Sequence, residues 1–318
     1  MKPVLRVSAI LATVLTVQSA AAHPVTVDSC GEPITLAAVP ERAVVHDLNM
    51  TEMFFALGLQ ERMVGVSGIT GWYKVDASFS EQLGDIPELA PKYPSMENLI
   101  AAEPDFFFAG WYYGMRPGGE VTPETLAAFD VTTLELTESC VHLDKEAPAA
   151  SMELLFGDML KLGQIFDKVA EAEALVDGWR TELDAIEASL GDGPAPRVFL
   201  YDSGEDQPFT AGRFAIPTAM IEAAGGKNVL DDLDMSWGRT SWEAVAERNP
   251  EFLVLLDYQE GAGYQTLLDF LKAHPAMSET DAVKNERFVA LRYAELTPGP
   301  ANIEAIKKIA AAMHGLEF

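Results

Sequence analysis

Short apolar runs alternate with amphipathic segments along the chain, and each kind of segment predicts its own secondary structure. The apolar runs are typical of buried strands, at residues 43–45, 63–66, 106–109, 131–136, 198–201, 252–257 and 288–291. The amphipathic segments predict helices, at residues 51–59, 123–129, 217–224, 264–273 and from about residue 300. Strands that alternate with helices favour parallel sheets covered on both faces. The pattern therefore predicts an α/β protein.

The middle of the chain, residues 151–194, has a helical pattern instead. Two apolar stripes follow the helical period, with a break at residues 163–167 between them: Leu154, Leu155, Met159, Leu162 and Phe166, then Leu175, Trp179, Leu183, Ile186 and Leu190. The second helix would be about 20 residues, or ~30 Å, long. A Gly/Pro-rich boundary, GDGPAP, follows it. We expect an N-terminal α/β lobe at residues 23–150, this helical segment with one long helix joining the lobes, and a C-terminal α/β lobe at residues 195–318.

One phrase occurs twice, once in each predicted lobe. Residues 95–106 read SMENLIAAEPDF, and residues 241–252 read SWEAVAERNPEF. In each copy the Ser is expected to cap a short helix, and the Glu two positions later lies near the positive end of the helix dipole. The Pro then ends the helix before a buried strand. The repeat predicts two similar halves that share one helix-to-strand unit.

The first 22 residues have the pattern of a signal peptide. Lys2 and Arg6 precede an apolar stretch from Val7 to Val17, and three alanines precede His23. The apolar stretch is shorter than a membrane-spanning helix needs. No Cys stands at the expected cleavage site, so a lipid anchor is not expected there. We expect an exported protein that is free in the periplasm.

The two cysteines of the chain, Cys30 and Cys140, fit an oxidising compartment, where such a pair usually forms one disulfide. Neither lies in a CxxC motif, so we expect a structural bridge. It would close a long loop, which in the chain-entropy model is worth at most about 4 to 5 kcal/mol.

The chain is strongly acidic, with 22 Lys and Arg against 49 Asp and Glu and a formal net charge of −27. This sign excludes a nucleic-acid partner, because affinity for nucleic acid rests on neutralising phosphates. The charge is otherwise typical of a solvated, repulsive surface, and we expect a monomer.

Three parts of the sequence resemble the class III periplasmic binding proteins, which deliver ferric siderophores, haem or cobalamin to ABC importers. They are PERAVVHDLNMTEMFFALGLQERMVGV, the two repeated phrases, and PFTAGRFAIPTAMIEAAGGKNVLDDLDMSWGRTSWEAV, which is similar to the same stretch of cobalamin-binding members. The resemblance covers essentially the whole chain after residue 22. It implies two lobes with mainly parallel central sheets, joined by a single long α-helix.

The resemblance also implies a ligand and a partner. An iron-siderophore-type chelate is the first expectation, with cobalamin and then haem as alternatives, and the partner is an ABC permease in the inner membrane. In this family one surface Glu on each lobe pairs with permease arginines, and Glu97 and Glu243 occupy those positions. No resident cofactor is implied.

Candidate ligand contacts follow from the ends of the predicted strands, because ligands of open α/β sheets bind outside the carboxyl ends of the strands. The candidates are aromatic or basic: His46, Trp72, Tyr73, Trp111, Tyr112, Tyr113, Arg116, Tyr201, Arg213, Trp237, Arg239 and Tyr293. The same rule also selects Tyr258, which follows the predicted strand at residues 252–257. The three consecutive aromatics at 111–113 cannot all enter one core, so at least one is expected to face the cleft. Trp237 aligns with a ligand-contacting Trp of the cobalamin-binding relatives, and arginines at the cleft would hold an anionic ligand.

Two other functions are open to an exported α/β protein. A bound divalent metal would need a spaced set of His and acidic ligands, and the five His of the chain form no such set. We therefore expect no metal-ion site, and His46 as a hydrogen-bonding group. An enzyme would need a motif such as GxSxG, and the nearest fragment, residues 202–204, lacks the preceding Gly and a His partner. We expect no catalytic activity.

Overall fold

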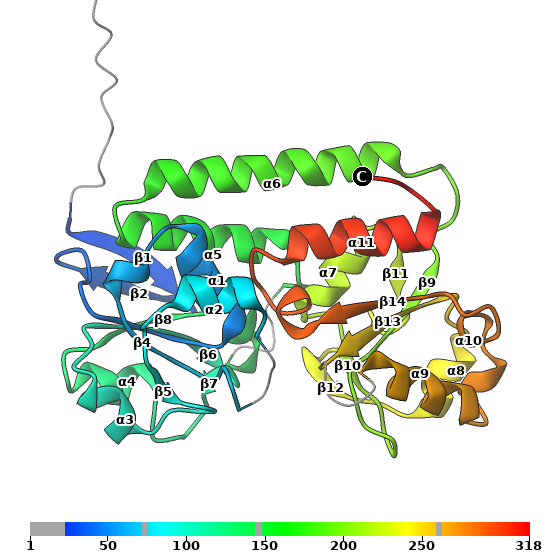
Figure 1. The fold of residues 1–318 in the computed structure, drawn as a ribbon, viewed down its shortest axis with the longest axis horizontal. Helices are drawn as coiled ribbons and strands as arrows, with labels where there is room; N and C mark the ends of the chain where they lie inside the picture. The colour runs from blue at the N-terminus through cyan, green and yellow to red at the C-terminus, as the bar shows by residue number, and fades with distance from the viewer. Residues whose placement is uncertain (1–22, 72–74, 144–147, 259–262) are drawn as a thin grey trace, which may run out of the picture.

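Two parallel sheets lie side by side below one long helix in this computed structural model, which describes residues 23–71, 75–143, 148–258 and 263–318 (Figure 1). The strands of the first sheet run in the order β5-β4-β3-β6-β7, with β8 also paired to β6, and every pair is parallel. Their bounds are β3 (Ala43–His46), β4 (Met63–Ser67), β5 (Glu88–Ala90), β6 (Phe106–Trp111), β7 (Gly114–Met115) and β8 (Thr132–Glu135). The other elements of this lobe are the hairpin β1 (Val25–Ser29) and β2 (Glu32–Leu36), α1 (Leu48–Ala56), η1 (Gln60–Arg62), α2 (Ala77–Leu83), α3 (Met96–Ala101), α4 (Pro123–Ala127) and η2 (Thr137–His142).

The second sheet is also wholly parallel, in the order β11-β9-β13-β14. Its strands are β9 (Arg197–Tyr201), β11 (Lys227–Asn228), β13 (Phe252–Asp257) and β14 (Phe288–Arg292), and a separate antiparallel pair is made by β10 (Phe209–Ala211) and β12 (Trp237–Arg239). The helices are α7 (Ile216–Ala223), α8 (Trp242–Glu247), α9 (Tyr264–Ala273), η3 (Met277–Glu279), α10 (Asp281–Lys284), η4 (Tyr293–Glu295) and α11 (Asn302–His314). The α/β class with two mainly parallel sheets is confirmed.

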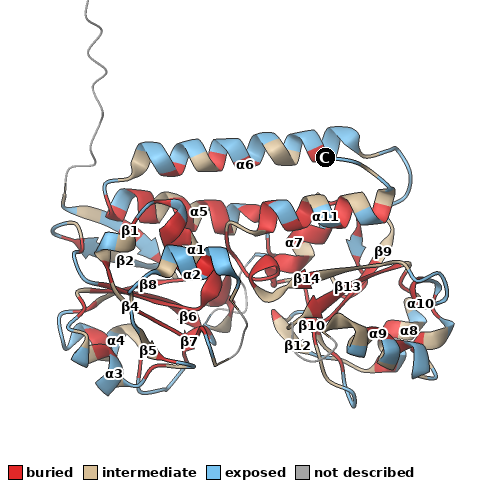
Figure 2. Cartoon of the chain, in the orientation of Figure 1, coloured by how far each residue is buried: buried red, intermediate tan, exposed pale blue. Residues whose placement is uncertain are grey.

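The central strands are apolar runs because helices cover both of their faces. All six residues of β6 are buried, and so are the first five of β13. Figure 2 shows these strands in red at the centre of each lobe, while the outer helices carry many exposed residues. This is the burial expected for strands of parallel sheets.

Helices α5 (Met152–Ile165) and α6 (Val169–Ser189) form the predicted helical segment. Helix α6 runs across both lobes and packs on α5 at one end and on α7 and α11 at the other (Figure 1). Gly163 lets the two helices approach closely, because a Cβ there would lie 2.5 Å from the Cβ of Ala172. The single long helix is confirmed, and the residue limits of the lobes stay a prediction.

The first helix begins earlier than the sequence pattern indicates. Helix α1 covers Leu48–Ala56 instead of residues 51–59, because the Asp47 side chain caps it and accepts from the Leu48 N–H at 2.7 Å. Asp47 itself has φ 70° and ψ 158°, a backbone region that is strained for any residue except Gly.

The repeated phrase forms the same structure in both lobes. Ser95 and Ser241 cap α3 and α8, accepting from backbone N–H groups three residues on at 3.2 and 3.1 Å. Both helices then turn through a left-handed residue, Glu103 or Asn249, directly before the Pro. The two similar halves are therefore visible in hydrogen bonds as well as in sequence.

An arginine holds this turn in each lobe. Arg42 Nε donates to Glu103 O and its Nη2 to Ala102 O, each at 2.6 Å. Arg197 Nε donates to Asn249 O at 2.9 Å in the equivalent place. Arg42 directly precedes β3, and Arg197 is the first residue of β9; each of these strands is the first of its sheet along the chain. Each arginine therefore connects the helix end to the sheet.

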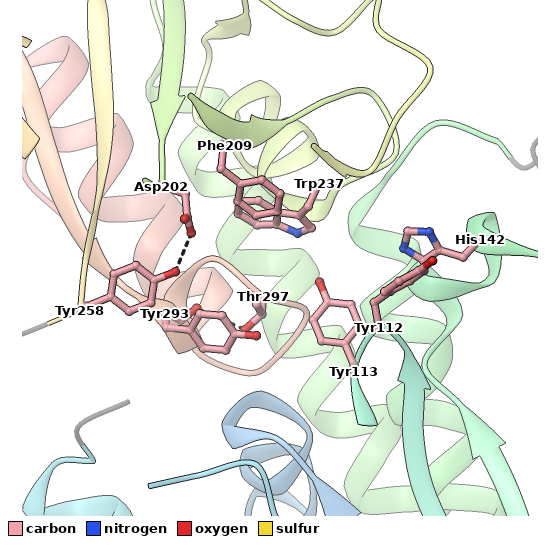
Figure 3. Close-up of a pocket in the computed structure, with 9 residues that line it drawn as sticks. All are labelled: Tyr112, Tyr113, His142, Asp202, Phe209, Trp237, Tyr258, Tyr293 and Thr297. Atoms are coloured by element: carbon pink, nitrogen blue, oxygen red, sulfur yellow. Dashed lines mark hydrogen bonds between the residues drawn. The ribbon is translucent and has the colours of Figure 1, made fainter. Parts of the chain in front are cut away.

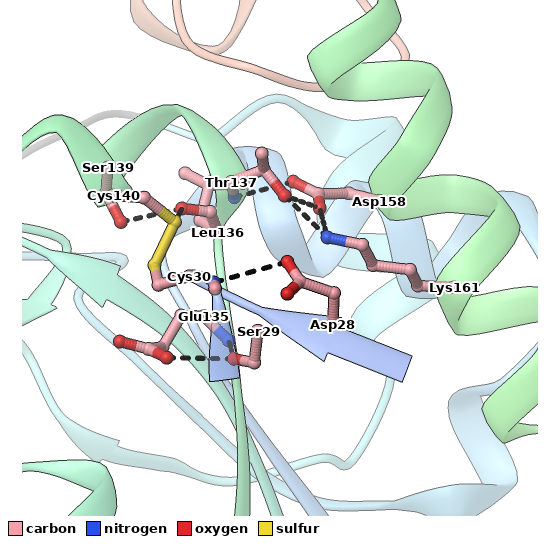
Figure 4. A network of polar contacts seen from close by, with 11 residues as sticks. Asp28, Ser29, Cys30, Glu135, Leu136, Thr137, Ser139, Cys140, Asp158 and Lys161 are labelled. Carbon is pink, nitrogen blue, oxygen red and sulfur yellow. Dashed lines mark hydrogen bonds and ion pairs between the residues drawn. A yellow bond between two sulfur atoms is a disulfide. The ribbon is translucent and has the colours of Figure 1, made fainter. Parts of the chain in front are cut away.

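Cys30 and Cys140 form the expected disulfide, which joins the β1–β2 hairpin to η2 across 110 residues (Figure 4). Beside it, Ser29 Oγ donates to Glu135 at 2.9 Å and accepts from the Glu135 N–H at 3.0 Å. These contacts fasten the hairpin to the edge of the first sheet. The bridge is structural, as expected.

Buried carboxyl groups connect the two lobes. Glu138, in η2, accepts from the Ile216 N–H at 2.6 Å, at the start of α7 in the other lobe, and from Tyr113 OH at 3.1 Å. Asp47, at the end of β3, accepts from Tyr293 OH at 2.9 Å, which follows β14. Glu138 and Asp47 are each only 3% exposed, so these bonds are shielded from water.

Burial raises the pKa of Asp47 to about 7 and the pKa of Glu138 to about 7, although the hydrogen bonds that each accepts act the other way. Between about pH 4 and pH 7 these two carboxyl groups stay protonated in the folded protein but are ionised in the unfolded chain. The free energy of unfolding therefore falls as the pH rises from about 4 through about 7. Burial also raises the pKa of Glu52 to about 7, so this group lowers the free energy of unfolding over the same pH range. Burial lowers the pKa of His46 to about 3, and this opposes the trend only below about pH 6.5.

We predict that the free energy of unfolding rises when the pH is lowered from about 8 to about 6.5, and that Glu138→Gln weakens this dependence. The amide still accepts from the Ile216 N–H and has no charge to bury. The variant should exceed the wild type at pH 8 by up to about 3 kcal/mol, since one pKa unit corresponds to about 1.4 kcal/mol. Urea unfolding at both pH values measures this.

Glu81→Gln, on the exposed surface of α2, is the matched control and should leave the pH dependence as it is. A Glu138→Gln variant with the wild-type pH dependence would contradict the assignment of a buried, protonated acid.

Candidate functional site

A cavity of about 510 Å³ lies between the lobes (Figure 3). The described residues that line it are Tyr112, Tyr113 and His142 from the first lobe, and Asp202, Phe209, Trp237, Tyr258, Tyr293 and Thr297 from the second. Six of these nine side chains are Tyr, Trp or Phe. The wall is therefore mainly aromatic, with hydroxyl groups, one imidazole and one carboxyl.

The strand ends place these side chains. Asp202 directly follows β9, Tyr258 directly follows β13, and Tyr293 directly follows β14. Parallel neighbouring strands present their carboxyl ends at one edge of the sheet, so the three residues meet there although the sequence separates them widely. In the other lobe Tyr112 and Tyr113 follow β6 in the same way.

Tyr112 lies in the turn between β6 and β7 with φ 64°, a left-handed conformation that is unfavourable for a side-chain-bearing residue. Its backbone is held by hydrogen bonds from Tyr93 OH to its carbonyl at 2.6 Å and from its own N–H to Met115 O at 2.8 Å. The ring is 52% exposed and meets His142 edge-on, with centroids 4.6 Å apart. The turn thus presents an open aromatic face to the cavity.

Phe209 and Trp237 form the opposite wall from the paired strands β10 and β12. Their rings are stacked, 6.0 Å apart with an interplanar angle of 19°. Within the described part of the chain, the buried Nε1 of Trp237 has no hydrogen-bond partner. A buried donor of this kind is costly unless something accepts from it.

Asp202 is the carboxyl of the described wall and is 4% exposed. Tyr258 OH donates to its Oδ2 at 2.9 Å, and Ser203 Oγ donates to its Oδ1. Burial raises the pKa of Asp202, and these two hydrogen bonds and the charge of Arg239 lower it. Burial, and then the charge of Asp202, raise the pKa of Tyr258, so its OH remains a donor at neutral pH.

Tyr112, Tyr113, Trp237 and Tyr293, all expected at the cleft, line the cavity, as does Tyr258. The expected pair at residues 72 and 73, Trp72 and Tyr73, lies outside the described residues. Sequence reasoning did not select His142, Asp202, Phe209 and Thr297. The strand-end rule could have reached Asp202, which stands directly after β9.

Three other candidates are placed in the interior. Trp111 is buried and donates from Nε1 to Glu135 at 2.6 Å, while its neighbours face the cavity. Tyr201 is 1% exposed and packs in the core of the second lobe. His46 is 2% exposed and its Nδ1 lies 2.9 Å from Ser67 Oγ, so it forms hydrogen bonds inside the lobe.

The three candidate arginines contact other groups instead of lining the described wall. Arg213 pairs with Asp234 at 2.8 Å, and Arg239 donates to Gln207 O at 2.8 Å. Arg116 lies over the ring of Tyr93. None of the three is among the described residues that line the cavity.

His142 and Asp202 supply the imidazole and the carboxyl group of the described wall, and they stand on opposite sides of it (Figure 3). Burial lowers the pKa of His142, so its imidazole is neutral at pH 7. In the described part of the chain no group of three or more His, Cys, Asp or Glu could hold a metal ion.

Glu97 and Glu243 occupy equivalent positions in α3 and α8, and both are exposed. The two helices lie on different lobes, on the side away from α6 (Figure 1). Over the described residues no helix has the length and apolar character needed to cross a membrane.

A model of the family described as periplasmic binding protein matches residues 44–294. An uncharacterised ABC transporter substrate-binding lipoprotein of Bacillus subtilis is 21% identical over 302 residues, covering 93% of this chain and 88% of the relative. A cobalamin-binding protein of Halobacterium salinarum is 25% identical over 301 residues, covering 93% of this chain and 75% of the relative.

Among solved structures, a periplasmic binding protein from Veillonella parvula has a TM-score of 0.81 and 28% identity, and the match covers 92% of this chain and 98% of that one. The family match spans most of both lobes and the helical segment between them. The chain belongs to the periplasmic binding protein family, with the class III fold of substrate-binding proteins that serve ABC importers.

Proposed function

We propose that this protein works as a monomer in the periplasm, captures a metal chelate between its lobes, and delivers it to an ABC permease in the inner membrane. The observation that carries the proposal is the aromatic cavity, which both lobes build at the carboxyl ends of their strands. Such a concave, largely apolar site with a few directed polar groups is typical of small-molecule binding. No step of the proposal is catalytic.

The wall favours a large chelate with flat apolar faces and uncharged polar groups. The stacked pair Phe209 and Trp237 and the exposed ring of Tyr112 offer flat surfaces from both lobes. The unpartnered Nε1 of Trp237 is covered in this structure, so it would donate to a ligand oxygen only after the indole ring moves. Only part of a large chelate would fit in about 510 Å³, and the remainder would extend into the opening between the lobes.

A corrinoid is the leading ligand of this proposal. It combines a flat metal-bearing ring with amide side chains, and the relative from Halobacterium salinarum is named a cobalamin-binding protein. A ferric siderophore, the first expectation of the sequence, stays a prediction and competes in the binding experiment. Haem is the third candidate ligand.

We predict that Trp237→Ala and Tyr112→Ala each weaken binding of the best chelate by about tenfold to a hundredfold, or about 1.4 to 2.8 kcal/mol, because each removes an aromatic contact face. Calorimetric titration with cobalamin, a ferric hydroxamate and haem measures the change. The control is Phe129→Ala, which truncates a ring that is 51% exposed and outside the described cavity wall, and it should bind as the wild type does. Wild-type affinity in both cavity variants would place the ligand elsewhere.

We predict that Glu97→Arg and Glu243→Arg leave chelate affinity unchanged and abolish delivery to the permease. Rim carboxylates matched to basic pockets set register and association rate, and a reversed charge opposes both. Uptake by cells, or stimulation of permease ATPase activity, measures delivery. Glu124→Arg is the control, since Glu124 is an exposed acid in the first turn of α4, in the lobe that also holds Glu97. Normal uptake with the double variant would refute this docking role.

A further inference from the structure

We propose that the cavity selects uncharged or cationic metal chelates over polyanionic ones, and that Asp202 is the residue that sets this preference. The inference rests on the proposed function, which leaves the charge of the chelate open. It narrows the substrate class and assigns a role to a residue that the sequence argument had not selected.

The charge of the wall is the first observation. Of the nine described residues that line the cavity, none is Lys or Arg, and seven carry no ionised group at neutral pH. The remaining two are His142, whose half-buried imidazole is neutral, and Asp202. A polyanionic ligand would meet a carboxyl group there and no fixed cation in the described wall.

Two of the three nearby arginines are engaged elsewhere. Arg213 is paired with Asp234, and Arg116 is stacked over Tyr93. Arg239 lies beside the wall, with its guanidinium carbon 5.7 Å from the centroid of the Phe209 ring and a hydrogen bond to Gln207 O. Burial raises the pKa of Asp202, whereas its two hydrogen bonds and the charge of Arg239 lower it.

The hydrogen bonds of Asp202 leave its carboxyl group able to accept a further bond from a ligand. Each carboxylate oxygen receives one hydroxyl, Ser203 on Oδ1 and Tyr258 on Oδ2. A carboxylate oxygen can accept more than one bond, so the group can still receive an N–H, an O–H or a cationic centre from a chelate. At 4% exposure its interaction with a charged ligand is weakly screened by water.

The donor side of the wall matches the same ligand class. The indole N–H of Trp237 lacks a partner in the described chain, and a movement of its ring would offer this covered donor to a neutral carbonyl oxygen of the ligand. A neutral donor can pair with such an oxygen without a compensating cation, whereas several ionised groups in a dry cavity need one. A wall with this donor and the Asp202 acceptor therefore fits amide-bearing or hydroxamate chelates better than tris-catecholates or propionate-bearing rings.

The test is a charge series titrated into the complete mature protein: cationic ferrioxamine B, neutral ferrichrome, cobinamide, the trianionic ferric complex of a tris-catecholate, and haem. We expect the tightest cationic or neutral probe to bind at least a hundredfold more tightly than either anionic probe. Asp202→Asn should narrow this ratio by about tenfold, by strengthening anionic and weakening cationic binding. Asp206→Asn, which removes an exposed charge nearby, is the matched control and should keep the wild-type ratio.

An anionic probe that binds most tightly, or an Asp202→Asn variant that changes all probes equally, would overturn the inference. Where Asp202→Asn does not fold, Asp202→Ser provides the same loss of charge with a smaller side chain. If no chelate in the series binds the wild type, the proposed function itself fails. If an anionic chelate binds best, the proposed function stands and only the charge preference fails.

Discussion

The cavity depends on carboxyl groups buried between the lobes, because the same groups that join the lobes also hold tyrosines of its wall. Glu138 bonds the start of α7 and Tyr113, and Asp47 bonds Tyr293. A change in lobe separation would therefore move the wall as well. Helix α6, about 30 Å long, spans both lobes and resists wide opening. We therefore expect a largely preformed site between two lobes that move little relative to each other.

The duplicated helix-to-strand unit also connects the outer surface of each lobe to its sheet. In each lobe an arginine, Arg42 or Arg197, fixes the end of the helix that bears the exposed glutamate, Glu97 or Glu243. Each helix is thereby tied to the leading strand of its sheet. Because α6 and the buried carboxyl groups link the two sheets, we expect the spacing of the two glutamates to change little. One set of contacts thus serves both the cavity and the proposed docking face.

The periodicity of the sequence was sufficient for the sheets, the long helix and the duplicated unit, because these depend on burial patterns along the chain. It was less informative about side-chain direction. At residues 111–113 the backbone sends Trp111 into the core, and the left-handed turn at Tyr112 leaves that ring exposed. The pairing of β10 with β12 brings Phe209 to Trp237, and no local signal marks it. The arginines Arg213 and Arg239 found partners that spacing could not identify.

The most direct test of the account is the position of the metal in a crystal of the protein grown with its tightest chelate. Anomalous diffraction at the metal edge would locate that atom without assumptions about the ligand's orientation. The account predicts one peak between the lobes, bounded by Tyr112 on one side and Trp237 on the other. A peak on the outer surface of either lobe, with this cavity filled only by water, would contradict it.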